Sequence, residues 1–156
     1  MYTVNPIWES INALDLNFLK GKIQEDPMSN GWTEEDADRA IQSFKRFFYL
    51  AGMNDDSVGV VPTKAIDCVW HAFILHTKAY ERTCRDLFGR FVHHDPSDSS
   101  KEDKALLKEG FENTKTRYES IFLEPYGSLP ALCQCSQGSC LGKCSNIETI
   151  GISATK

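Results

Sequence analysis

The chain has 156 residues, of which 41% are hydrophobic and 25% are charged, as in an ordinary globular domain. Seventeen Lys and Arg residues against 22 Asp and Glu residues give a net charge of −5. The chain therefore lacks the broad basic field that binding to nucleic acid requires. It also has no run of about 18 apolar residues that could cross a bilayer. We expect neither nucleic acid nor a membrane as a partner.

Apolar residues recur at helical spacing from the beginning of the chain. Residues 7–23 predict a helix or a pair of helices. After a turn-rich segment, Thr33 and Asp36 resemble a capping box for a second apolar run, 37–51. Gly52 is a typical residue at which a helix ends.

The middle of the chain predicts a further buried helical segment. Residues 64–91 approximate one apolar stripe, and Thr77 could cap a second piece, so we expect one helix or two in line. Residues 93–100 are rich in Ser and Asp and predict a loop. Ser100 then begins a last amphipathic helix, whose apolar positions end at Phe122. We predict a single all-α, bundle-like domain of about five helices over residues 6–126, followed by a Cys-rich tail, 127–156.

The segment from Val60 to Pro96 carries a joint pattern that includes Trp70-His71, Phe88-Gly89 and His93-His94. This pattern resembles that of the glycine-rich domain-containing protein-like family. The resemblance extends over roughly residues 14–126. It implies a domain that recurs in larger proteins and for which no settled activity is known.

All four histidines of the chain lie within 24 residues. Imidazole is the commonest protein ligand of metal ions, so His71, His93 and His94 are the predicted metal ligands. Asp67 lies one helical turn before His71 and would either bind the ion or orient the imidazole. His76 projects about 140° away from His71 on a helix and is the poorest partner. The alternative is that Asp67 and His71 form a hydrogen-bonded polar pair without a metal.

Other residue types near the histidines suggest further roles. Asp67, His71 and Cys84 are candidate catalytic residues, although an apolar stripe favours core packing for Cys84. Trp70 and Tyr80 are candidate pocket residues, which could grip a partner peptide instead of supporting chemistry.

Four cysteines gather within twelve residues near the end of the sequence, at positions Cys133, Cys135, Cys140 and Cys144. Four thiolates at this spacing can surround one tetrahedral ion, with zinc as the first candidate. A reduced tail without metal and a disulfide-bonded tail are the alternatives. Clustered cysteines are typical of metal sites in a reducing compartment, so we expect a cytoplasmic protein.

Two functional hypotheses follow. The first is a metal-binding helical protein, or a small metal-dependent enzyme, with a divalent ion held between the Trp-His helix and the His-His loop. The second is a non-enzymatic module that binds a protein or peptide partner at the same place.

Overall fold

The computed structural model describes residues 5–26, 29, 31–55 and 58–127. These residues form six α-helices and one short 3-10 helix, and they contain no strand. The elements are α1 (Pro6–Asn12), η1 (Asn17–Leu19), α2 (Lys20–Glu25), α3 (Glu34–Gly52), α4 (Lys64–Leu75), α5 (Thr77–Phe88) and α6 (Lys101–Phe122). The prediction of an all-α fold is confirmed.

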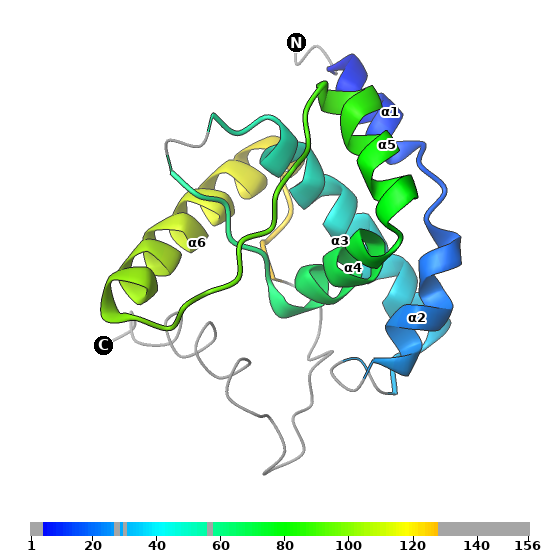
Figure 1. Ribbon diagram of the computed structural model, residues 1–156, viewed down its shortest axis with the longest axis horizontal. Helices are drawn as coiled ribbons and strands as arrows, with labels where there is room; N and C mark the ends of the chain where they lie inside the picture. The colour runs from blue at the N-terminus through cyan, green and yellow to red at the C-terminus, as the bar shows by residue number, and fades with distance from the viewer. Residues whose placement is uncertain (1–4, 27–28, 30, 56–57, 128–156) are drawn as a thin grey trace.

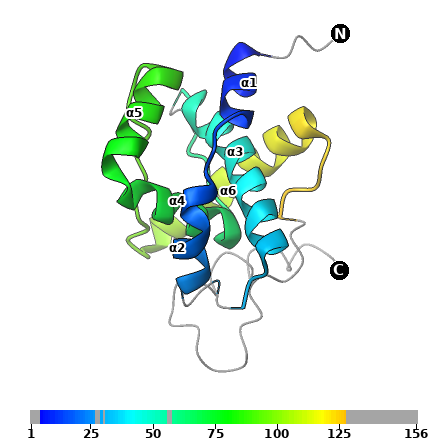
Figure 2. The ribbon, with the colours of Figure 1, turned by 90° about the vertical axis from the view of Figure 1, so that its right-hand side faces the viewer.

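Helix α3 is the central element of the fold. It contacts α1, α2, α4 and α6, which lie around it in two perpendicular views (Figures 1 and 2). Its buried residues include Phe44, Phe47 and Phe48, which are fully removed from solvent. The apolar stripe that predicted this helix is therefore the middle of the hydrophobic core.

Side-chain caps fix where the helices begin. Asp36 N donates to Thr33 Oγ1 at 3.1 Å and Thr33 N donates to Asp36 Oδ2 at 2.9 Å, so the predicted capping box is present. Ser100 caps α6 by accepting from the backbone N–H of Asp103. Thr63 caps α4 in the same way, by accepting from Ile66 N. These local bonds satisfy N–H groups that the helix itself leaves free.

Of the two alternatives for residues 64–91, two helices are observed, and Thr77 is the first residue of the second helix and not its cap. Helix α4 ends at Leu75 and α5 begins at Thr77, with His76 between them at φ −82° and ψ 60°, outside the helical region. Gly89 ends α5 in the left-handed conformation. The following loop then passes back beside α4 before α6 begins (Figure 1). This return brings residues of the loop against the exposed face of α4.

The chain that follows α6 is attached close to the beginning of α4. Tyr126 donates its buried hydroxyl to the backbone oxygen of Val61 at 2.7 Å, and its N–H bonds to Glu119 Oε1 at 3.0 Å. Apart from Gly127, the Cys-rich tail lies outside the described residues, and the domain boundaries stay a prediction. Within the described part of the chain, no helix is both long enough and apolar enough to cross a membrane.

Candidate metal centre

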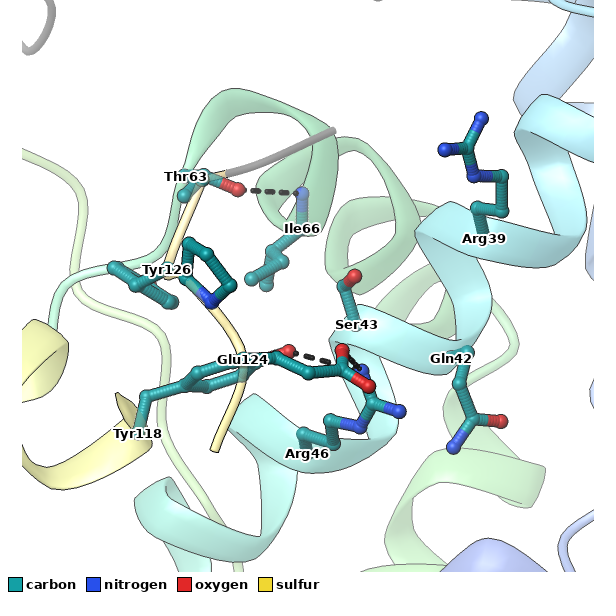
Figure 3. A pocket seen from close by; sticks show the side chains of 11 residues that line it. Arg39, Gln42, Ser43, Arg46, Thr63, Ile66, Tyr118, Glu124 and Tyr126 are labelled. Carbon is teal, nitrogen blue, oxygen red and sulfur yellow. Dashed lines mark hydrogen bonds and ion pairs between the residues drawn. The ribbon is translucent and has the colours of Figure 1, made fainter. Parts of the chain in front are cut away.

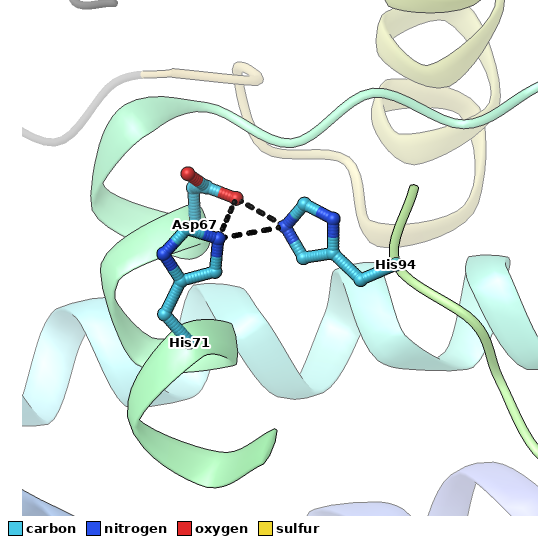
Figure 4. A group of neighbouring side chains, drawn as sticks. All are labelled: Asp67, His71 and His94. Carbon is cyan, nitrogen blue, oxygen red and sulfur yellow. Dashed lines mark hydrogen bonds and ion pairs between the residues drawn. The ribbon is translucent and has the colours of Figure 1, made fainter. Parts of the chain in front are cut away.

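Asp67, His71 and His94 bring three potential ligand atoms to one place (Figure 4). Asp67 and His71 are one turn apart on α4, and His94 comes from the loop after α5. His94 Nε2 lies 2.6 Å from Asp67 Oδ1 and 3.1 Å from His71 Nε2, and the remaining separation, from His71 Nε2 to Asp67 Oδ1, is 3.5 Å. We call these three residues the Asp–His–His cluster.

The size of this triangle fits a metal ion. A circle through three atoms separated by 2.6, 3.1 and 3.5 Å has a radius of about 1.8 Å. Zinc binds histidine nitrogen and carboxylate oxygen at roughly 2.0–2.2 Å. A point at that distance from all three atoms therefore exists about 1 Å outside their plane. For tetrahedral angles at such an ion, the 2.6 Å contact would have to widen by roughly 0.7–1 Å, whereas the other two separations are already close to the required length.

The same contacts also form a hydrogen-bonded set. Asp67 makes its shorter contact with His94 and its longer one with His71, so the carboxylate lies between both imidazoles. A ring nitrogen can donate at most one proton, and a carboxylate only accepts. At most two protons can therefore serve the three contacts, and a cation bound by all three atoms could take their place.

A buried frame holds His94 in place. Its ring packs against Trp70, with ring centroids 4.2 Å apart. Trp70 Nε1 donates to the hydroxyl of Tyr80 at 2.9 Å, and that hydroxyl donates to the backbone oxygen of Val92 at 2.6 Å. Since Val92 is two residues before His94, this chain of bonds fixes the loop that carries the imidazole.

Trp70 and Tyr80, the predicted pocket residues, therefore lie in the core directly behind the cluster. Their exposed fractions are 3% and 1%. The sequence singled out both aromatic residues, but it did not show that one supports the other through a hydrogen bond.

The cluster itself is open on one side. The side chain of His71 is 57% exposed and that of Asp67 is 28% exposed, whereas His94 is only 15% exposed. Solvent can therefore reach the place where an ion would be held. An ion with three protein ligands here would keep at least one position for water or another ligand.

The two remaining histidines do not take part in the cluster; of these, only His93 was a predicted ligand. His93 is exposed and its ring packs 4.8 Å from that of Phe91, so the structure does not bring it to the cluster. His76 packs against Phe18 with ring centroids 5.0 Å apart.

Cys84 is fully buried, like the neighbouring core residues. Burial raises the pKa of its thiol, and hydrogen bonding to Val92 and Tyr80 opposes that rise. A protonated, enclosed thiol is a poor nucleophile and a poor metal ligand. The structure thus places Cys84 in the core and not with Asp67 and His71.

A separate cavity of about 250 Å³ lies between α3, the beginning of α4 and the segment after α6 (Figure 3). Arg39, Arg46 and Tyr118 line it, and Arg46 forms an ion pair with Glu124 across its edge. None of the described residues that line it belongs to the predicted site. The sequence offered no signal for this cavity, because its lining comes from three distant segments.

Fold and site together define an all-α protein with two histidines and one aspartate convergent near its surface. Residues 16–122 match the model of a family described as UCP032817-like, and the chain belongs to that family. The match covers the helices from η1 to α6, including the whole Asp–His–His cluster. Comparison with curated proteins and with solved structures finds no significant similarity. The resemblance to glycine-rich domain-containing proteins stays a prediction.

Proposed function

We propose that this chain binds one divalent metal ion through Asp67, His71 and His94, with zinc as the first candidate. The observation that supports the proposal is the convergence of one carboxylate oxygen and two imidazole nitrogens within 3.5 Å of one another. Two imidazoles and a carboxylate are a frequent ligand set for zinc and for non-haem iron.

The exposed side of the cluster is relevant to what such a site does. An ion held there acts as a Lewis acid on whatever occupies its free position. The protein supplies rigidity, because Trp70 packs against His94, and α4 fixes the spacing of Asp67 and His71. This arrangement suits a small metal-dependent enzyme better than a closed structural site.

The alternative is a module that binds a protein or peptide at a pocket around Trp70, His71 and Tyr80. Of these three side chains only that of His71 is exposed, and the two aromatic side chains that would grip the partner are buried. The metal hypothesis therefore has the stronger support. We also propose that the protein works in the cytoplasm, where the clustered tail cysteines would stay reduced.

Elemental analysis of the full chain after dialysis against zinc tests the proposal. We expect His71→Ala to lower the zinc content by one equivalent while changing the free energy of unfolding of the metal-free protein by less than about 1 kcal/mol, because the side chain is largely exposed. His93→Ala is the matched control, since this exposed imidazole adjoins the cluster without belonging to it. Equal zinc content in the wild type, His71→Ala and His94→Ala proteins would refute a metal site at this cluster.

A further inference from the structure

The cavity between α3, the beginning of α4 and the segment after α6 takes no part in the proposed metal site (Figure 3). Its volume of about 250 Å³ equals the volume of roughly eight water molecules in the liquid. It therefore has room for a small organic molecule, and its lining indicates of which chemical class.

Polar side chains of α3 form one wall of the cavity. Arg39, Ser43 and Arg46 follow one another at intervals of four and three residues, so they lie on the same face of this helix. Within the described part of the chain, neither Arg39 nor Ser43 has a hydrogen-bond or ion-pair partner. This wall thus offers a guanidinium and a hydroxyl that the fold itself does not use.

Arg46 is held in place and still keeps free donors. Its Nη1 contacts the carboxylate of Glu124 and the hydroxyl of Tyr118, and its Cζ lies 5.8 Å from the ring centroid of Phe122. A guanidinium carries five N–H donors. No described residue accepts from Nε or Nη2 of Arg46. These two nitrogens match the two oxygens of a carboxylate, so Arg46 can bind a second carboxylate beside that of Glu124.

The hydroxyl of Tyr118 supplies a further donor. Tyr118 is only 3% exposed and it lines the cavity. Its oxygen accepts from Arg46 Nη1 at 3.4 Å, and no described residue accepts its own proton. A buried O–H group without an acceptor costs free energy, which an acceptor oxygen in the cavity would remove.

The charges around the cavity favour a ligand with a single negative charge. Arg39 and Arg46 are the cations of its lining and Glu124 is the anion, so the lining carries a net positive charge of one. Asp36 lies one turn before Arg39, but its carboxylate accepts from the backbone of Thr33 in the capping box. A monoanion neutralises the lining, whereas a dianion would leave an excess negative charge.

Apolar groups form another part of the lining. Ile66, Pro125 and the ring of Tyr126 contribute to it, and Ile66 and Tyr126 are buried. The rings of Tyr118 and Tyr126 lie 4.9 Å apart and together present an aromatic surface. A ligand that joins a carboxylate to an apolar body would contact both kinds of wall.

We infer that this cavity is a binding site for a small organic monocarboxylate with an apolar body. Arg39, Ser43 and Arg46 bind its carboxylate, and the aromatic and aliphatic side chains of the lining contact its body. The carboxylate of Glu124 competes with the ligand for Arg46 and so limits the affinity. This site is separate from the Asp–His–His cluster and does not depend on a bound metal ion.

Titration of benzoate into the full chain, followed through the backbone amide signals in NMR spectra, tests the inference. We expect the signals of Ser43, Arg46 and Ile66 to shift, with a dissociation constant of about 0.1–1 mM for a ligand of this size. Benzamide has nearly the same shape but no charge, and it should bind at least about tenfold more weakly.

Variants of the lining make the test sharper. Arg39→Gln and Ser43→Ala should each weaken benzoate binding by about threefold to tenfold while the spectrum of the folded protein persists, since neither side chain has a partner in the fold. Arg82→Gln is the matched control, because Arg82 is an exposed arginine of α5 outside the lining and its loss changes the net charge equally. Glu124→Gln should strengthen binding by about threefold to tenfold, because it removes the competing carboxylate.

Several results would overturn the inference. These are the absence of benzoate binding at about 10 mM, equal affinity for benzamide, and shifts confined to other parts of the chain. Unchanged affinity in both Arg39→Gln and Ser43→Ala would do the same, as would a Glu124→Gln protein that binds benzoate no more tightly than the wild type. Tighter binding of inorganic phosphate than of benzoate would indicate a site for phosphate groups and would also overturn it.

Discussion

At the scale of single residues, the hydroxyl of Tyr80 is the most consequential group behind the Asp–His–His cluster. It accepts from Trp70 Nε1 and donates to the backbone oxygen of Val92. We predict that Tyr80→Phe lowers the free energy of unfolding by about 1–3 kcal/mol, because it leaves a buried donor and a buried acceptor without partners. Denaturation with urea at neutral pH measures this loss.

Burial also makes the stability depend on pH through Tyr80. It raises the pKa of this phenol well above the ordinary value of 10.0. In the unfolded chain the phenol loses its proton above pH 10, whereas in the folded protein it keeps it, so stability falls as the pH rises through that range. The buried hydroxyl of Tyr126 and the thiol of Cys84 act in the same direction.

The Tyr80→Phe protein supplies the test of this pH dependence. It should be less stable at pH 7 but should lose stability less steeply above pH 10 than the wild type. Identical slopes in the two proteins would show that the hydroxyl of Tyr80 is not the buried, neutral group described here.

The candidate site illustrates which residues a sequence can identify. Asp67 and His71 are one turn apart on a helix, so their proximity follows from local geometry alone. The choice of His94 over its neighbour His93 does not, because it depends on the contact with Trp70 and on the bond from Tyr80 to Val92. Asp67 and His94 are 27 residues apart, and only the folded chain shows that they touch.

At the scale of elements, close packing holds the segment before α4 against α6. Val61 N donates to Thr114 Oγ1 at 2.9 Å. A Cβ on Gly110 would lie 2.8 Å from Val61 Cγ2 and 2.9 Å from the backbone oxygen of Gly59. Glycine at position 110 therefore permits α6 to approach this segment.

We predict that Gly110→Ala destabilises the protein by about 1–3 kcal/mol, because backbone atoms must move to admit the methyl group. Gly21→Ala is the matched control: it lies in α2 with nothing within 4 Å of its added Cβ, so the better helix propensity of alanine should stabilise by about 0.5–1 kcal/mol. Urea denaturation of both variants measures whether each substitution lowers or raises the free energy of unfolding. A stabilising Gly110→Ala would contradict the close packing.

Helix starts could be predicted where the signal is local. Thr33 and Ser100 begin helices because their hydroxyls bond to N–H groups three residues ahead. The break at His76 was foreseen as an option, since Thr77 can begin a helix. The return of the loop after α5 to α4 was part of the metal hypothesis, but which of its two histidines would reach α4 was not, because that depends on how the loop packs.

At the scale of the whole molecule, an ion in the Asp–His–His cluster would join α4 to the loop that precedes α6. Such an ion binds only where the fold brings these segments together, so zinc should stabilise the folded state by an amount that rises with the logarithm of its concentration relative to its dissociation constant. The place proposed for the ion is defined by three ligand atoms, two on α4 and one on the loop after α5.

Anomalous diffraction at the zinc absorption edge, from crystals of the full chain grown with zinc, tests that claim most directly. We expect a peak at roughly 2.0–2.2 Å from Asp67 Oδ1, His71 Nε2 and His94 Nε2. Crystals of the His71→Ala protein should lack this peak. A map in which these three side chains contact only one another, with zinc absent or held elsewhere, would contradict metal binding at the Asp–His–His cluster.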